Sequence, residues 1–165
     1  MESKGNKKEF FRVLEERLDL ARDVGQWRYE RLITLTAKEA SFSYIGGVFG
    51  MKLDPDETIE KVFSEGRGSV SIGYLGGYEA SLVMTGEDPV FSEEAFDFQK
   101  EMMDFIRNKV DAYKETTNKG FGLYASPSES LTDRFCGLDL KKFGKVEGVT
   151  DKGFYVNSFH VNTQA

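Results

Sequence analysis

The first part of the chain places apolar residues at helical spacing. Between Lys7 and about Leu32, Phe11, Leu14 and Leu18 recur at steps of three and four residues, and charged side chains occupy the other face. This period predicts one long amphipathic helix. A glycine at position 25 weakens the prediction, because glycine costs about 1 kcal/mol relative to alanine in a helix.

A second long helix is predicted after Ser92, a residue type that favours the N-cap position. Glu93 and Glu94 suit the positive end of such a helix. Its apolar stripe consists of Phe98, Met102, Ile106, Val110 and Tyr113.

A shorter helix is predicted to open at Asp54-Pro55-Asp56-Glu57, which places an N-cap aspartate before a proline. Gly66 and Gly68 would end this helix. The preceding segment, residues 40–51, is rich in glycine and gives only a weak helix prediction.

Two short apolar runs predict strands that lead directly into helices. One strand, at about Ser69–Tyr74, enters a helix near Gly77. The other, Phe121–Ala125, enters a helix that should run from Ser126 to about Phe143. A last strand is predicted at 154–161.

Helices that separate short apolar strands favour an α/β fold with parallel strands. The chain of 165 residues is expected to form a single helix-rich domain over residues 1–165. Its strands are few, which is more typical of part of a sheet or barrel than of a closed barrel.

Composition excludes several classes of function. The net charge of −6 argues against non-specific binding of nucleic acid. No apolar run approaches the roughly 20 residues that span a bilayer, and the charged start does not resemble a signal peptide. A single cysteine, Cys136, excludes an internal disulfide and fits a reducing cytoplasm. With His160 as the single histidine, ligands for a structural zinc are too few, so we expect no cofactor in this chain.

The segment Ser126-Pro127-Ser128-Glu129 has the S-x-x-E pattern of a capping box at a strand-to-helix turn. Such a turn presents free backbone N–H groups at the positive helix end, where phosphate groups bind readily. The hydroxyl groups of Ser126, Ser128 and Ser130 could add donors. Plain helix capping remains the alternative, because Asp54–Glu57 has a similar pattern with no sign of phosphate binding.

The glycine-rich segment Gly73–Glu79 lacks the spacing of a dinucleotide or P-loop motif. Its glycines are expected to allow close packing or positive φ angles. Glu79 is either a functional carboxylate or a residue that favours the helix dipole.

Four further polar residues have open interpretations. Cys136 lies mid-helix, which predicts a buried small side chain rather than a reactive thiol. His160 is expected to face solvent or to form a hydrogen bond. Asn157 and Ser158 are candidates for contact with a ligand, or could cap the end of a strand.

Several blocks of sequence, in order, resemble the large subunit of the anaerobic (class III) ribonucleoside-triphosphate reductases. They are KKEFFRVLEERLDLA, SVSIGYLGGYEASLVMTG, and GFGLYASPSESLTDRF with KKFGKVEGVTDKGFYVNSFHV. The resemblance implies a ten-stranded α/β barrel with a finger loop, of which this chain would form part of the second half. It also implies reduction of ribonucleotides by glycyl and thiyl radicals, commonly with formate as reductant.

The resemblance places the finger-loop cysteine, the structural zinc and the glycyl radical domain outside this segment. Cys136 does not match the thiyl position, so the isolated chain is expected to be inactive. Expected partners are the remaining reductase segments, a radical-SAM activase, the ribonucleoside triphosphate substrate and, through an unpaired sheet edge, a second copy of the chain. The chain would be an excised piece or one chain of a split enzyme.

The resemblance further implies that the strand-to-helix turn cradles substrate phosphates. The residues concerned are Ser126, Ser128, Glu129, Ser130 and Leu131, with Glu129 as a cap. The alternative hypothesis is a non-enzymatic module that keeps the fold and binds nucleotides or a partner.

Overall fold

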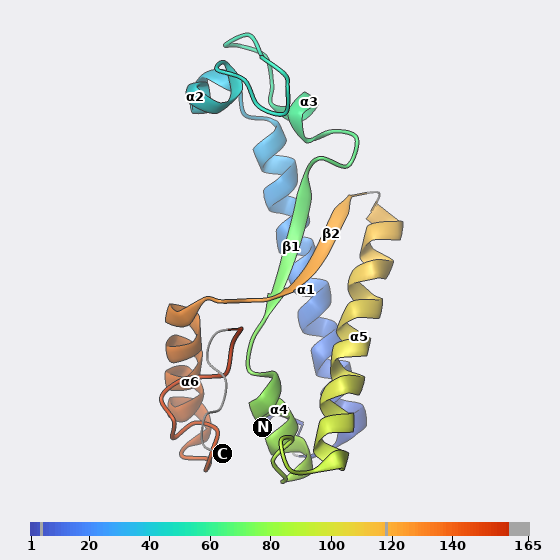
Figure 1. Cartoon of the computed structure of the whole chain (residues 1–165), viewed down its shortest axis with the longest axis vertical. Coiled ribbons are helices and arrows are strands. Elements are labelled where there is room, and N and C mark those ends of the chain that lie inside the picture. Colours follow the sequence, from blue (N-terminus) through green and yellow to red (C-terminus); the bar gives the residue numbers. More distant parts are fainter. Residues whose placement is uncertain (4, 118, 159–165) are drawn as a thin grey trace. The chain divides into compact units, whose positions relative to one another are not determined.

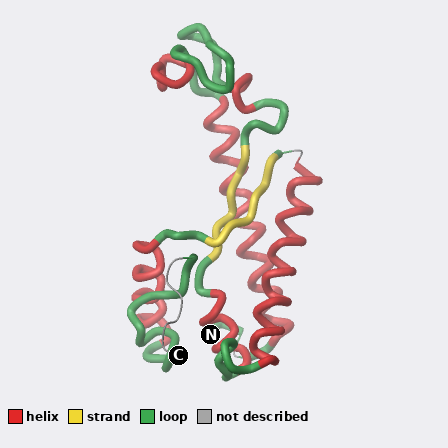
Figure 2. Tube along the Cα trace, viewed as in Figure 1, coloured by secondary structure: helices red, strands yellow, loops and turns green. Residues whose placement is uncertain are grey.

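The computed structural model describes residues 1–3, 5–117 and 119–158, and helices predominate in it (Figures 1 and 2). The helices are α1 (Lys7–Ile33), the 3₁₀ helix η1 (Ala37–Ala40), α2 (Ser41–Tyr44), α3 (Glu60–Phe63), α4 (Gly77–Thr85), α5 (Glu93–Thr117) and α6 (Glu129–Phe143), and the strands are β1 (Ser69–Tyr74) and β2 (Gly120–Ala125). Contacts divide the chain into two compact units. Unit 1 holds 1–17, 73–109 and the chain from Leu123 onward, and unit 2 holds 18–72 and 110–122.

Strands β1 and β2 pair directly and run in the same direction. At their amino ends Gly120 lies against the backbone of Gly68, and at their carboxyl ends the Ser126 N–H donates to the Tyr74 carbonyl at 3.0 Å. The predicted helix-rich α/β arrangement with parallel strands is therefore confirmed at this level. The predicted strand at 154–161 is wrong for Phe154–Ser158, which form no strand, and residues 159–161 lie outside the described residues.

The predicted apolar stripe of α5 is confirmed, because all five of its residues are buried. In unit 1, the Phe98 ring packs against the rings of Phe10 and Phe11, with centroids 5.3 and 6.0 Å apart. The predicted cap is also present, since Ser92 Oγ accepts a hydrogen bond from the Ala95 N–H at 3.3 Å.

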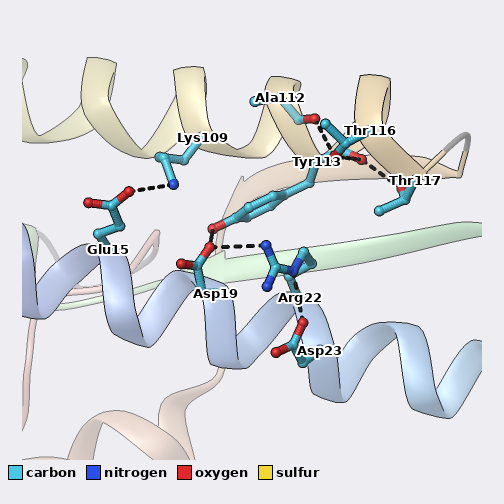
Figure 3. Close-up of polar contacts among 9 residues, drawn as sticks. All are labelled: Glu15, Asp19, Arg22, Asp23, Lys109, Ala112, Tyr113, Thr116 and Thr117. Atoms are coloured by element: carbon cyan, nitrogen blue, oxygen red, sulfur yellow. Dashed lines mark hydrogen bonds and ion pairs between the residues drawn. The ribbon is translucent and has the colours of Figure 1, made fainter.

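In unit 2, a polar cluster joins α1 to α5 (Figure 3). The Tyr113 hydroxyl donates to Asp19 Oδ1 at 2.7 Å, and the Arg22 guanidinium contacts the same oxygen at 3.2 Å. Arg22 also lies over the Tyr113 ring, 5.0 Å from its centroid, and its hydrogen bond to Asp23 raises the pKa of the guanidinium. The cluster gives a hydrogen-bond partner to the Tyr113 hydroxyl, which is the polar group of the otherwise apolar α5 stripe.

The helix predicted to open at Asp54 begins later, at Glu60 in α3. Residues 54–57 form a turn instead, because their carbonyl groups are bonded elsewhere: the Pro55 carbonyl accepts from the Lys38 N–H at 3.0 Å, and the Glu57 carbonyl accepts from the Ala37 N–H at 2.9 Å. These bonds place Ala37 in a buried cluster, which also contains Leu53, Ile59 and Val62.

Gly25 in α1 is a site of close packing rather than a weak point. A methyl group at this position would overlap Cγ1 of Val70 in β1. The Val70 side chain therefore makes any residue larger than glycine unfavourable at position 25.

We expect Gly25→Ala to destabilise unit 2 by about 1–2 kcal/mol, because overpacking outweighs the gain of about 1 kcal/mol in helix propensity. Urea unfolding measures the change. Gly137→Ala in α6 is the matched control, since nothing lies within 4 Å of that position and the substitution should stabilise. Equal stabilisation by both substitutions would contradict the close approach, and adding Val70→Ala should relieve the loss at Gly25.

Candidate functional site

The turn between β2 and α6 begins one residue beyond the strand. The Ser126 N–H donates to the Tyr74 carbonyl, so Ser126 extends the parallel ladder. Its own carbonyl, which would accept the first bond of a helix starting there, accepts from the Ser158 N–H at 3.4 Å instead. Ser128 takes the N-cap position and α6 begins at Glu129. The predicted helix start at Ser126 is therefore wrong, and Glu129, as the first helical residue, cannot close the predicted capping box with Ser126.

The serine hydroxyl groups of this turn bond to each other. The buried Ser126 Oγ donates to Ser128 Oγ at 2.9 Å and accepts from the Ser128 N–H at 3.4 Å. Ser128 Oγ makes no cap hydrogen bond to the helix. Leu131 donates to the Ser128 carbonyl at 3.1 Å, so the N–H groups before Leu131 belong to the helix end that has no acceptor inside the helix.

Asn157 and Ser158 lie beside the same turn. The Ser158 N–H donates to the Ser126 carbonyl at 3.4 Å, and the Asn157 side-chain amide donates to the Pro127 carbonyl at 3.3 Å. The structure thus brings together two groups of candidate residues that are some 30 positions apart in the sequence. Ser130 and Leu131 lie on the exposed surface of the first turn of α6, while His160 lies outside the described residues.

The second strand-to-helix turn, after β1, uses its glycines as predicted. Gly76 is the N-cap of α4 and has a φ of 76°, in the left-handed region that favours glycine. Gly73 lies close to Tyr124 and Ser126, where a Cβ would come within 3.1 Å of the tyrosine ring. Gly76 therefore allows a positive φ angle, and Gly73 allows close packing.

Glu79, in the first turn of α4, has specific hydrogen-bond partners in addition to its favourable place at the positive end of the helix dipole. Its side chain is 3% exposed, and its Oε1 accepts from Lys152 Nζ at 2.5 Å and from the Val156 N–H at 2.9 Å. Sequence reasoning identified the glutamate but missed both partners. A signal was present in the glycines before Glu79, since they bring neighbouring backbone close to the start of the helix.

Cys136 is buried, as predicted, and its Sγ lies 3.7 Å from the Val149 carbonyl oxygen. Burial raises the pKa of its thiol above the ordinary value of 9.0. Nearby, burial and the 2.7 Å hydrogen bond from the Tyr155 hydroxyl to Asp139 raise the pKa of Tyr155 above 10.0. Both groups are therefore held in their neutral forms, and the thiol is not a nucleophile at neutral pH.

Alkaline pH should weaken this region. Because the pKa values of Cys136 and Tyr155 are raised in the folded chain, the unfolded chain loses these protons first. Their contribution is complete below about pH 8, under the unfolded pKa of the thiol, and falls as pH rises toward and through the folded values. Between about pH 8 and pH 11, the free energy of unfolding should fall more steeply for the wild type than for Cys136→Ala/Tyr155→Phe. Parallel pH profiles would contradict the assignment.

Two features are absent from the part of the chain that the structure describes. No helix there is long and apolar enough to cross a membrane. Within the same ranges, no three side chains of His, Cys, Asp or Glu gather as they would around a metal ion.

Comparison with known proteins gives one consistent result. The family model for anaerobic ribonucleoside-triphosphate reductase matches residues 1–165. The chain is 41% identical over 165 residues to the anaerobic ribonucleoside-triphosphate reductase of Escherichia coli K12, covering 99% of this chain and 23% of that protein. The enzyme of the same description from Salmonella typhimurium is 39% identical over 165 residues, with the same coverage. That of Enterobacteria phage T4 is 36% identical over 159 residues, covering 96% of this chain and 25% of that protein. The chain thus spans about a quarter of the length of these relatives.

Proposed function

The chain belongs to the anaerobic ribonucleoside-triphosphate reductase family, and we propose that it serves such a reductase as a segment of the second half of its α/β barrel. The reaction is the reduction of ribonucleoside triphosphates to deoxyribonucleotides. The match along the whole chain favours this function over a stand-alone binding module. Support from the fold comes from β1 and β2, two parallel strands that are each followed by a helix, as in the repeating unit of an α/β barrel.

Exposed apolar residues support association with other reductase segments or with a second copy. In unit 1, Leu131, Phe135 and Leu138 form a stripe on α6 at helical spacing and are 36%, 42% and 50% exposed. A face of this kind is expected where another protein segment packs.

The sites for the radical-SAM activase, the glycyl radical and the structural zinc are assigned to the remainder of the reductase. The location assigned to the protein is the cytoplasm.

The contribution of this segment to the reaction is binding, not radical chemistry. The neutral, buried Cys136 is unsuited to serve as a thiyl radical that reaches a substrate. The turn formed by Ser126–Leu131 would bind the substrate triphosphate through first-turn N–H groups of α6 and the Ser128 hydroxyl. The observation that carries this assignment is the meeting of Asn157 and Ser158 with that turn, which adds polar groups from a second segment.

The turn by itself is only weakly suited to binding an anion. Glu129, as the first residue of α6, opposes negative charge, and the chain has a net charge of −6. Basic residues from other reductase segments would supply the missing positive charge. The isolated chain should therefore bind triphosphate weakly.

Titration with tripolyphosphate tests this function in the isolated chain. We expect a Kd of about 1 mM or weaker, with backbone amide shifts concentrated at residues 126–131 and 157–158. Ser128→Ala should weaken binding about threefold, because it removes one hydroxyl donor worth roughly 0.5–1.5 kcal/mol.

Ser92→Ala at the start of α5 is the matched control. It removes a helix-cap hydroxyl that lies next to Glu93 and Glu94, where an anion is disfavoured. Binding should be unchanged in this variant. Shifts that avoid residues 126–131, or equal losses in the two variants, would refute the phosphate assignment.

A further inference from the structure

Glu79 is the only charged residue among the buried residues that the structure describes. Removal of a carboxylate from water costs several kcal/mol unless ionic and hydrogen-bonding partners replace the water. The partners of Glu79 are Lys152, whose Nζ also lies 4.9 Å from the centroid of the Tyr78 ring, and the Val156 backbone. The second carboxylate oxygen, Oε2, is buried without a hydrogen-bond partner in the described part of the chain.

The bond to Val156 modifies a familiar helix cap. Glu79 is the third residue after the N-cap Gly76, where a capping box would direct the carboxylate to the N-cap N–H. Here the Gly76 N–H donates to the Val156 carbonyl at 2.7 Å, and the Val156 N–H donates to Glu79 at 2.9 Å. Val156 therefore replaces the direct hydrogen bond between the N-cap residue and Glu79. Both its carbonyl and its N–H are hydrogen-bonded as a result.

The next two residues, Asn157 and Ser158, contact the Ser126–Leu131 turn. Asn157 and Ser158 contact the turn through bonds of 3.3 and 3.4 Å, longer than both bonds at Val156. Val156 thus attaches this segment to α4, and Tyr155 attaches it to α6 through the 2.7 Å hydrogen bond from its hydroxyl to Asp139. Asn157 and Ser158 extend from Val156 to the turn.

We propose that Glu79 is a positioning residue that holds residues 156–158 beside the Ser126 turn. The proposal rests on the phosphate-binding function inferred for that turn. Glu79 does not touch the phosphate. It fixes the backbone position from which Asn157 and Ser158 act, across 77 residues of sequence.

Two double variants of the full chain isolate this role. Glu79→Gln/Lys152→Met and Glu79→Leu/Lys152→Met both remove the buried charge pair and keep similar side-chain volumes. They differ in one respect, because glutamine retains an acceptor for the Val156 N–H and leucine does not. Comparison between them therefore excludes the effect of losing the ion pair.

In the leucine variant we expect the Val156 and Ser158 amides to exchange with solvent about tenfold faster than in the glutamine variant. Tripolyphosphate should bind the leucine variant about 5–10-fold more weakly. A merely structural role would lower the unfolding midpoint and leave the Kd of the folded protein unchanged, so both quantities are measured.

The outcomes separate the two proposals. Equal exchange rates or equal Kd values in the two variants would overturn the positioning role. Different exchange rates with no tripolyphosphate shifts in the wild type would refute the phosphate function and leave the attachment of Val156 by Glu79 supported. If the leucine variant does not fold, NMR coupling across the hydrogen bond from the Val156 amide to the Glu79 carboxyl carbon gives a second test in the wild type, and its absence would overturn the proposal.

Discussion

The parallel pairing of β1 with β2 is the constraint on which the candidate site depends. Parallel strands cannot be joined by a tight turn, so the chain crosses over through α4 and α5 before β2 returns beside β1. The crossover brings the carboxyl ends of the two strands together, where the Ser126 N–H bonds to the Tyr74 carbonyl. The starts of α4 and α6 consequently both follow this edge of the sheet, and residues 156–158 bond to both. The shared edge thus brings together the three segments of the candidate site.

Backbone hydrogen bonds to distant segments override local helix signals in this protein. Ser126 and Asp54 each precede a proline and lie three residues before a glutamate, a pattern that favours a helix start. Neither residue starts its helix, because backbone groups near each are bonded elsewhere: Ser126 to the β1 end and to Ser158, and the 54–57 turn to Lys38 and Ala37. Such bonds can prevail because a cap contributes only about 1 kcal/mol, whereas an unpaired buried backbone group costs a comparable amount or more. At Gly76 the same competition has another result, with Val156 inserted between the N-cap and Glu79.

The amino-acid sequence by itself determined the elements whose signals are local. The stripe from Phe98 to Tyr113 predicted α5, the period after Lys7 predicted α1, and the two apolar runs predicted β1 and β2 to within a residue, because a 3.6- or 2-residue period is a property of the segment alone. The sequence also identified Ser126–Leu131, Asn157 and Ser158 as candidates, and its resemblance to the reductases gave the family.

Only the tertiary structure decided what these residues contact. The delayed start of α6, the turn at 54–57, the absence of strand structure at Phe154–Ser158 and the burial of Glu79 against Lys152 all depend on backbone or charge partners from distant segments. The role of Gly25 has the same origin, since a helix pattern records the cost of glycine but not the Val70 side chain that excludes a methyl group. A sequence pattern states what a segment prefers, and the long-range hydrogen bonds and close contacts that compete with this preference exist only once the chain has folded.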